Sequence, residues 1–121
     1  MMNPENAYLV HAARILFWLA LAFTCLMATL PNPPQALFES DNANHMMAFA
    51  ALTALHKVGY RGFGVWRRIW VMAFVGGAIE LVQSIPSLHR DAEWMDWFAD
   101  IAAVLAASIV VNFLVPIRRQ T

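Results

Sequence analysis

The stretch ELVQSIPSLHRDAEWMDWFAD, residues 80–100, contains one Gln, one His, one Arg and five carboxylates between two apolar segments. Its central loop, residues 86–93, begins with a proline, which ends a helix. The segments on either side are long enough to cross a bilayer as helices. The stretch therefore predicts two antiparallel apolar helices whose polar residues gather near their shared end.

The composition of the whole chain indicates a membrane protein. Of its 121 residues, 60% are apolar and 13% are charged, whereas soluble domains average ~45–50% and ~25%. The net charge is zero, so no nucleic-acid partner is expected. The single cysteine, Cys25, excludes an intrachain disulfide and a thiolate metal cluster. The length suits one domain.

Four apolar segments predict a single all-α domain, a polytopic four-helix transmembrane bundle. The second segment is the least apolar because it contains His56 and Lys57. It would extend only about 24 Å against a ~30 Å hydrocarbon core, so Lys57 must snorkel and residues 42–44 must lengthen the helix. We expect His11, His56 and His89 at interfacial or surface positions. The predicted spans are residues 7–30, 44–60, 68–85 and 94–117.

The basic residues predict the orientation. Of the eight Lys and Arg residues, only Arg90 falls on one side of the four-span arrangement. Basic residues mark the cytoplasmic side, so both termini are expected there, with loops 31–44 and 86–93 outside. Trp94 and Trp97 are expected at the outer interface. The basic residues on the cytoplasmic side are Arg14, Lys57, Arg61, Arg67, Arg68, Arg118 and Arg119.

Depth along the helices brings polar residues of three spans to the outer end. Glu80 lies six residues before the proline that ends the third span, and Asp100 lies six residues after the start of the fourth. Both carboxylates therefore lie ~9 Å below the same boundary. His45 begins the second span from that side. A charge at membrane centre costs ~2.5–3.5 kcal/mol, so such residues persist only if they are paired, hydrated or functional.

These residues form the candidate site. The substrate-binding candidates are Asp41, His45, Gln83 and Arg90. The candidates for catalysis are Glu80, Asp96 and Asp100. Small residues on the packed faces could also support a homo-oligomer.

The order and spacing of these residues resemble the VanZ-like family of small integral membrane proteins. The segments that carry the resemblance are SDNANHMMAFAAL and ELVQSIPSLHRDAEWMDWFADIAAVLAA, and it covers about residues 41–107. The family pattern is a DKxxH helix start, then ExxQ, then Arg, Asp six residues on, and Asn or Asp four further. The matching positions are Asp41 and His45, Glu80 and Gln83, then Arg90, Asp96 and Asp100.

The chain departs from that pattern in ways that make the site more anionic. Asn42 stands where the family often has Lys, and Asp100 where it often has Asn. Ala103 and Ala107 replace glycines that usually follow. The resemblance implies a multi-pass protein of the bacterial inner membrane. It also implies a link to the cell envelope and to antibiotic resistance, because the name-giving member is associated with tolerance of the glycopeptide teicoplanin.

Three functions suit this pattern. The first is binding of a membrane lipid or lipid-linked envelope component, with Arg90 taking an anionic group and the carboxylates accepting hydrogen bonds. The second is acid/base or metal-assisted hydrolysis of a lipid-linked substrate, which leaves open whether the protein is an enzyme. A metal on His45, Glu80, Asp96 and Asp100 is chemically reasonable, but no HExxH-like spacing marks one, so no metal and no cofactor is expected. The third is a structural polar network that fixes helix pairing.

Overall fold

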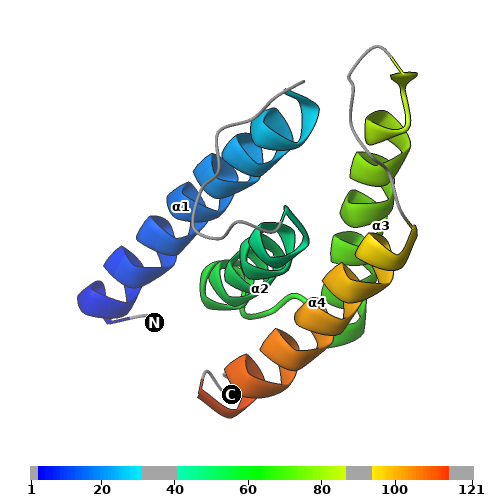
Figure 1. Ribbon diagram of the computed structural model, residues 1–121. Coiled ribbons are helices and arrows are strands. Elements are labelled where there is room, and N and C mark those ends of the chain that lie inside the picture. Colours follow the sequence, from blue (N-terminus) through cyan, green and yellow to red (C-terminus); the bar gives the residue numbers. More distant parts are fainter. Residues whose placement is uncertain (1–2, 31–40, 87–93, 115–121) are drawn as a thin grey trace.

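The computed structural model describes residues 3–30, 41–86 and 94–114, and the regular elements in these ranges are four α-helices (Figure 1). The predicted all-α class is confirmed. The first three helices each begin three residues earlier than predicted, and the C-terminal end of the predicted fourth span lies outside the described residues. The helices are α1 (Pro4–Thr29), α2 (Asp41–Gly59), α3 (Val65–Gln83) and α4 (Trp94–Leu114).

Local chemistry explains the start of α1 and the apolar faces of the helices. The Asn3 side chain caps α1 by accepting a hydrogen bond from the Glu5 amide at 3.2 Å, and Pro4 occupies the first turn. Within the helices, the Thr24 and Thr53 hydroxyls donate to carbonyls one turn earlier, at 2.8 and 2.7 Å. These hydroxyls are therefore satisfied within their own helix and need no partner outside it.

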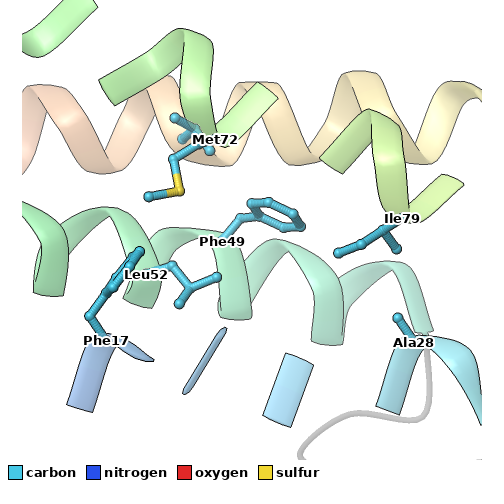
Figure 2. Packing of buried hydrophobic residues seen from close by; sticks show 7 residues of the cluster. Phe17, Ala28, Phe49, Leu52, Met72 and Ile79 are labelled. Atoms are coloured by element: carbon cyan, nitrogen blue, oxygen red, sulfur yellow. The ribbon is translucent and has the colours of Figure 1, made fainter. Parts of the chain in front are cut away.

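The helices alternate in direction around a shared apolar core. Figure 2 shows Phe17, Leu52 and Met72 toward one end of this core, and Ala28 and Ile79 toward the other. The later part of α2 thus lies beside the early parts of α1 and α3, so α2 runs antiparallel to both. Figure 1 shows α4 running antiparallel to α3. Consequently α1 and α3 end, and α2 and α4 begin, at the same end of the bundle.

Helix α2 occupies the centre, and its position explains its weak hydropathy. It packs mainly against α1 and α4. Among the described residues, α1, α3 and α4 expose many large apolar side chains, whereas α2 exposes only Met47. Conversely, Thr53 and Lys57 of α2 are at most 1% exposed. Because α2 faces other helices, it needs no continuous apolar surface.

The structure corrects the expectation for one of the three histidines. His56 is buried, and its ring lies within 5.1 Å of the Phe17 ring, centroid to centroid. His11 is exposed, as expected, and His89 lies outside the described residues. A polar residue near the end of a helix is expected at the interface, but α1 packs over His56 through Phe17 and buries it.

Two helices in the described part of the chain, α1 and α4, are long and apolar enough to cross a membrane. The same helices turn large apolar side chains outward, among them Trp18 and Phe23 of α1 and Phe113 of α4. Soluble monomers rarely leave so much contiguous apolar surface uncovered.

The contact between α3 and α4 is made by an indole ring against glycine. Trp97 is half-buried and its Nε1 donates to the Ala73 carbonyl at 2.8 Å. A Cβ atom at Gly76 would lie 3.2 Å from Trp97 Cδ1 and 3.4 Å from Phe49 Cζ. The small residues of α3 therefore admit a ring from the neighbouring helix. Trp97 is packed between α3 and α4, whereas Trp94 at the start of α4 is exposed.

We expect Gly76→Val to lower the free energy of unfolding by about 1–3 kcal/mol, because its branched side chain would push Trp97 and Phe49 apart. Thermal unfolding of the purified protein in detergent measures the effect. Gly62→Val is the control, since nothing lies within 4 Å of a Cβ atom there. Equal unfolding midpoints for the two variants would contradict the tight contact.

Candidate functional site

Three helices bring one histidine and two carboxylates together. His45 lies near the start of α2, Glu80 near the end of α3 and Asp100 near the start of α4. One potential ligand atom from each residue lies within 4.8 Å of the other two. Glu80 is 3% exposed, Asp100 is 2% exposed and His45 is half-buried. We call this set the His45–Glu80–Asp100 cluster; it forms because the three helix ends coincide.

The two carboxylates of the cluster repel each other when both are ionised. At a separation within 4.8 Å, two ionised groups repel each other by at least about 3 kcal/mol at an effective dielectric constant of ~20. Within the described part of the chain, Asp100 Oδ1 accepts no hydrogen bond although it is buried. Such a pair persists when a proton or a cation lies between its members. The cluster is therefore suited to hold a positively charged or hydrogen-bond-donating group.

Two other candidate residues are described, and they occupy different positions. Gln83 is 3% exposed, and its Nε2 donates to the Ala28 carbonyl at 3.1 Å, which ties α3 to the end of α1. This amide has a structural partner at the same end of the bundle as the cluster. Asp96 lies one helical turn before Asp100, is half-buried, and does not belong to the three-residue set.

The remaining candidates are not placed. Asp41 is the first residue of α2, but its side chain lies outside the described part of the structure, and so does Arg90 as a whole. The predicted binding roles of both residues stay predictions.

An apolar groove runs between α2 and α4. It is open on one side, has a volume of about 580 Å³, and is lined by Ala, Met and Val residues, from Ala43 to Ala54 on α2 and from Ala103 to Val111 on α4. Its α2 side spans about 16 Å at the helical rise. Asp100, Ala103 and Ala107 share one face of α4 through i, i+3 and i, i+7 spacing. The groove therefore begins about one helical turn from the Asp100 carboxylate.

A second polar group lies at the opposite end of the bundle, centred on Arg68. This side chain is 1% exposed, and its Nε donates to His56 Nδ1 at 2.8 Å. Its Nη2 donates to the Tyr60 and Phe63 carbonyls at 3.1 and 2.9 Å. These bonds satisfy acceptors at the C-terminal end of α2 and in the following turn, where a cation is also favoured by the helix dipole.

Arg14 extends this group from α1. Its Nε donates to the Gly59 carbonyl at 2.8 Å, and its guanidinium carbon lies 4.8 Å from the centroid of the Tyr60 ring. A Cβ atom at Gly59 would come within 3.0 Å of Arg14 Cγ. The sequence pattern identified these arginines only as topology signals. The sequence shows that these residues are charged. It does not show which backbone carbonyls accept their hydrogen bonds, because these carbonyls come together only when the turn after α2 forms.

In the described ranges, the chain is an all-helical protein in which a half-buried histidine and two buried carboxylates meet at one end of the bundle. Comparisons of the chain with protein-family models, curated proteins and solved structures found no match. The VanZ-like resemblance thus rests on its residue pattern, and functional inference rests on the geometry of this chain.

Proposed function

We propose that the chain is a four-span membrane protein that binds an amphiphile at its outer end. The polar headgroup contacts the His45–Glu80–Asp100 cluster, and one acyl chain lies in the groove between α2 and α4. The observation that carries the proposal is their adjacency, because an apolar groove begins about one helical turn from a buried carboxylate.

The apolar exterior and the charge distribution support the membrane location. Large apolar side chains cover the outward faces of α1, α3 and α4, and two of these helices have membrane-spanning length. In a bilayer, α1, α3 and α4 pack against α2, so its buried polar residues, such as Thr53 and Lys57, face protein instead of lipid. The Lys and Arg asymmetry favours cytoplasmic termini and the cluster at the outer end.

The chemistry of the cluster supports a headgroup that donates hydrogen bonds. Carboxylates accept hydrogen bonds from hydroxyl and amine groups, which sugar and aminoalcohol headgroups supply. The groove volume of about 580 Å³ lies in the range of ligand pockets, ~300–1,000 Å³. By its VanZ-like resemblance, we propose a lipid or lipid-linked component of the bacterial cell envelope, with glycopeptide tolerance as the expected phenotype.

The groove is tested by filling it. Ala106→Trp would place an indole in the groove, whereas Ala102→Trp adds the same side chain to α4 outside it; both alanines are exposed. Native mass spectrometry should find a lipid bound to the wild-type protein and to Ala102→Trp. We expect at least about a tenfold loss of bound lipid in Ala106→Trp, equivalent to ~1.4 kcal/mol. Equal lipid retention by both tryptophan variants would contradict acyl-chain binding there.

Orientation is tested by cysteine labelling in a Cys25→Ala background. Ser84 and Gly62 are both exposed and lie at opposite ends of α3. A membrane-impermeant thiol reagent applied to intact cells should modify the Ser84→Cys variant and leave Gly62→Cys unmodified, because basic residues surround the Gly62 end. Modification of Gly62→Cys alone would invert the orientation, and modification of both would rule out a membrane-crossing α3.

A further inference from the structure

We propose that the His45–Glu80–Asp100 cluster binds one divalent transition-metal cation of the zinc class. The sequence pattern predicted no metal, because the three residues lie on separate helices and share no local spacing motif. This site goes beyond amphiphile binding and does not rest on it, since the cluster would hold the cation with the groove empty or filled.

The geometry supplies three ligands from three directions. An imidazole nitrogen of α2 and carboxylate oxygens of α3 and α4 lie within 4.8 Å of one another. A cation bound at ~2.0–2.2 Å keeps two ligand atoms at most about 4.4 Å apart. The side chains would therefore close around it by small rotations. Three protein ligands leave a coordination position open for water or for an oxygen of a bound headgroup.

Charge balance is compatible with a divalent cation. Two ionised carboxylates carry a charge of −2, and one divalent cation neutralises it fully while His45 stays neutral and able to act as a ligand. Asp100 offers the independent observation. It is 2% exposed, and among the described residues its Oδ1 accepts no hydrogen bond, so a buried lone pair remains available to a cation.

The ligand types select the metal. Imidazole binds Zn²⁺, Fe²⁺ or Ni²⁺ more readily than Mg²⁺ or Ca²⁺, while carboxylates accept all of these ions. A set of one nitrogen and two oxygens therefore favours transition metals over Mg²⁺. Among the commonly available divalent ions, Zn²⁺ binds such sites more tightly than Mn²⁺. Zn²⁺ also adapts to four or five ligands, which suits a site assembled from three helix ends.

Titration of the purified full-length chain tests the site directly. After chelator treatment in detergent, isothermal titration calorimetry with ZnCl₂ should give one zinc per chain, and thermal unfolding should shift to higher temperature because the ion links three helices. MgCl₂ at the same concentration should produce no comparable shift. An absence of both zinc binding and stabilisation would overturn the proposal.

Variants establish whether the zinc occupies this cluster. We expect Glu80→Gln and Asp100→Asn each to weaken zinc binding at least about tenfold, while each keeps the size of the side chain. The controls are Glu5→Gln and His11→Ala, which change an exposed acid and an exposed histidine of α1; both should bind zinc as the wild type does. Zinc binding that survives in both cluster variants, or is lost in both controls, would show adventitious surface binding and overturn the site.

A final variant separates this inference from the proposed function. Ala106→Trp obstructs the groove and leaves the three ligands unchanged, so it should bind zinc normally whether or not it retains lipid. Loss of lipid with zinc retained supports both proposals. Retained lipid with zinc retained contradicts the groove alone, and absent zinc in the wild type contradicts the metal site alone.

Discussion

Replacement of Arg68 by methionine should lower the free energy of unfolding by about 2–4 kcal/mol, because it leaves hydrogen-bond acceptors without their donor. The guanidinium donates to His56 Nδ1 and to two backbone carbonyls, those of Tyr60 and Phe63. Methionine fills similar space but donates nothing, so the buried His56 Nδ1 and the part-buried Phe63 carbonyl would lose this partner, whereas the Tyr60 carbonyl would keep the Phe63 amide at 3.0 Å. The unfolding midpoint in detergent, with helicity followed by circular dichroism, measures the loss.

Lys57→Met is the matched comparison. Lys57 is as buried as Arg68, at 1% exposed, and belongs to the same end of the bundle. Within the described residues it lacks the set of acceptors that Arg68 has, so its replacement should leave the midpoint unchanged or raise it. If Lys57→Met lowers the unfolding midpoint as much as Arg68→Met does, the Arg68 end of the bundle is stabilised by positive charge in general and not by the specific hydrogen bonds of Arg68.

The second large effect concerns both carboxylates of the cluster. The double variant Glu80→Gln with Asp100→Asn should raise the stability of the metal-free protein by about 1–3 kcal/mol, because it removes two buried like charges. The same variant should lose zinc binding and lipid retention entirely. A change that stabilises the fold while abolishing binding is typical of residues retained for function.

Three measurements on the double variant decide between a functional cluster and a structural one: unfolding midpoint after chelation, zinc titration and bound lipid by native mass spectrometry. Glu5→Gln serves as the control, because Glu5 is an exposed acid at the start of α1, at the other end of the bundle from the cluster. A double variant that is less stable than the wild type, yet retains lipid, would favour the third interpretation of the sequence, a polar network that holds the helices together.

Local properties of the sequence were sufficient to predict the four helices and the depth of Glu80 and Asp100 along them. Runs of apolar residues interrupted by Pro, Gly and Asn predicted four helices, since helix formation and termination depend on near neighbours. A constant rise per residue put Glu80 and Asp100 at equal depth in the predicted hairpin. The structure brings these two carboxylates together with His45, within 4.8 Å.

The burial of individual side chains was harder to predict from the sequence, because it depends on which helix packs against each face of its neighbours. His56 looked interfacial, yet it is covered by Phe17 and hydrogen-bonded by Arg68. Trp97 packs against the glycines of α3, a contact that the sequence did not predict. Both side chains can lie in water or in a protein interior, and their own neighbours in sequence do not distinguish these alternatives.

The sequence by itself therefore determined the helices, their alternation in direction and the end of the bundle at which the acids lie. All three follow from backbone hydrogen bonding, hydropathy and short connections. Only the tertiary structure decided that α2 is central, that Arg68 binds the end of α2, and that a groove begins one turn from Asp100. These features depend on the spacing between helices, which is determined by side chains such as Phe49 and Trp97 that meet from segments far apart in the chain.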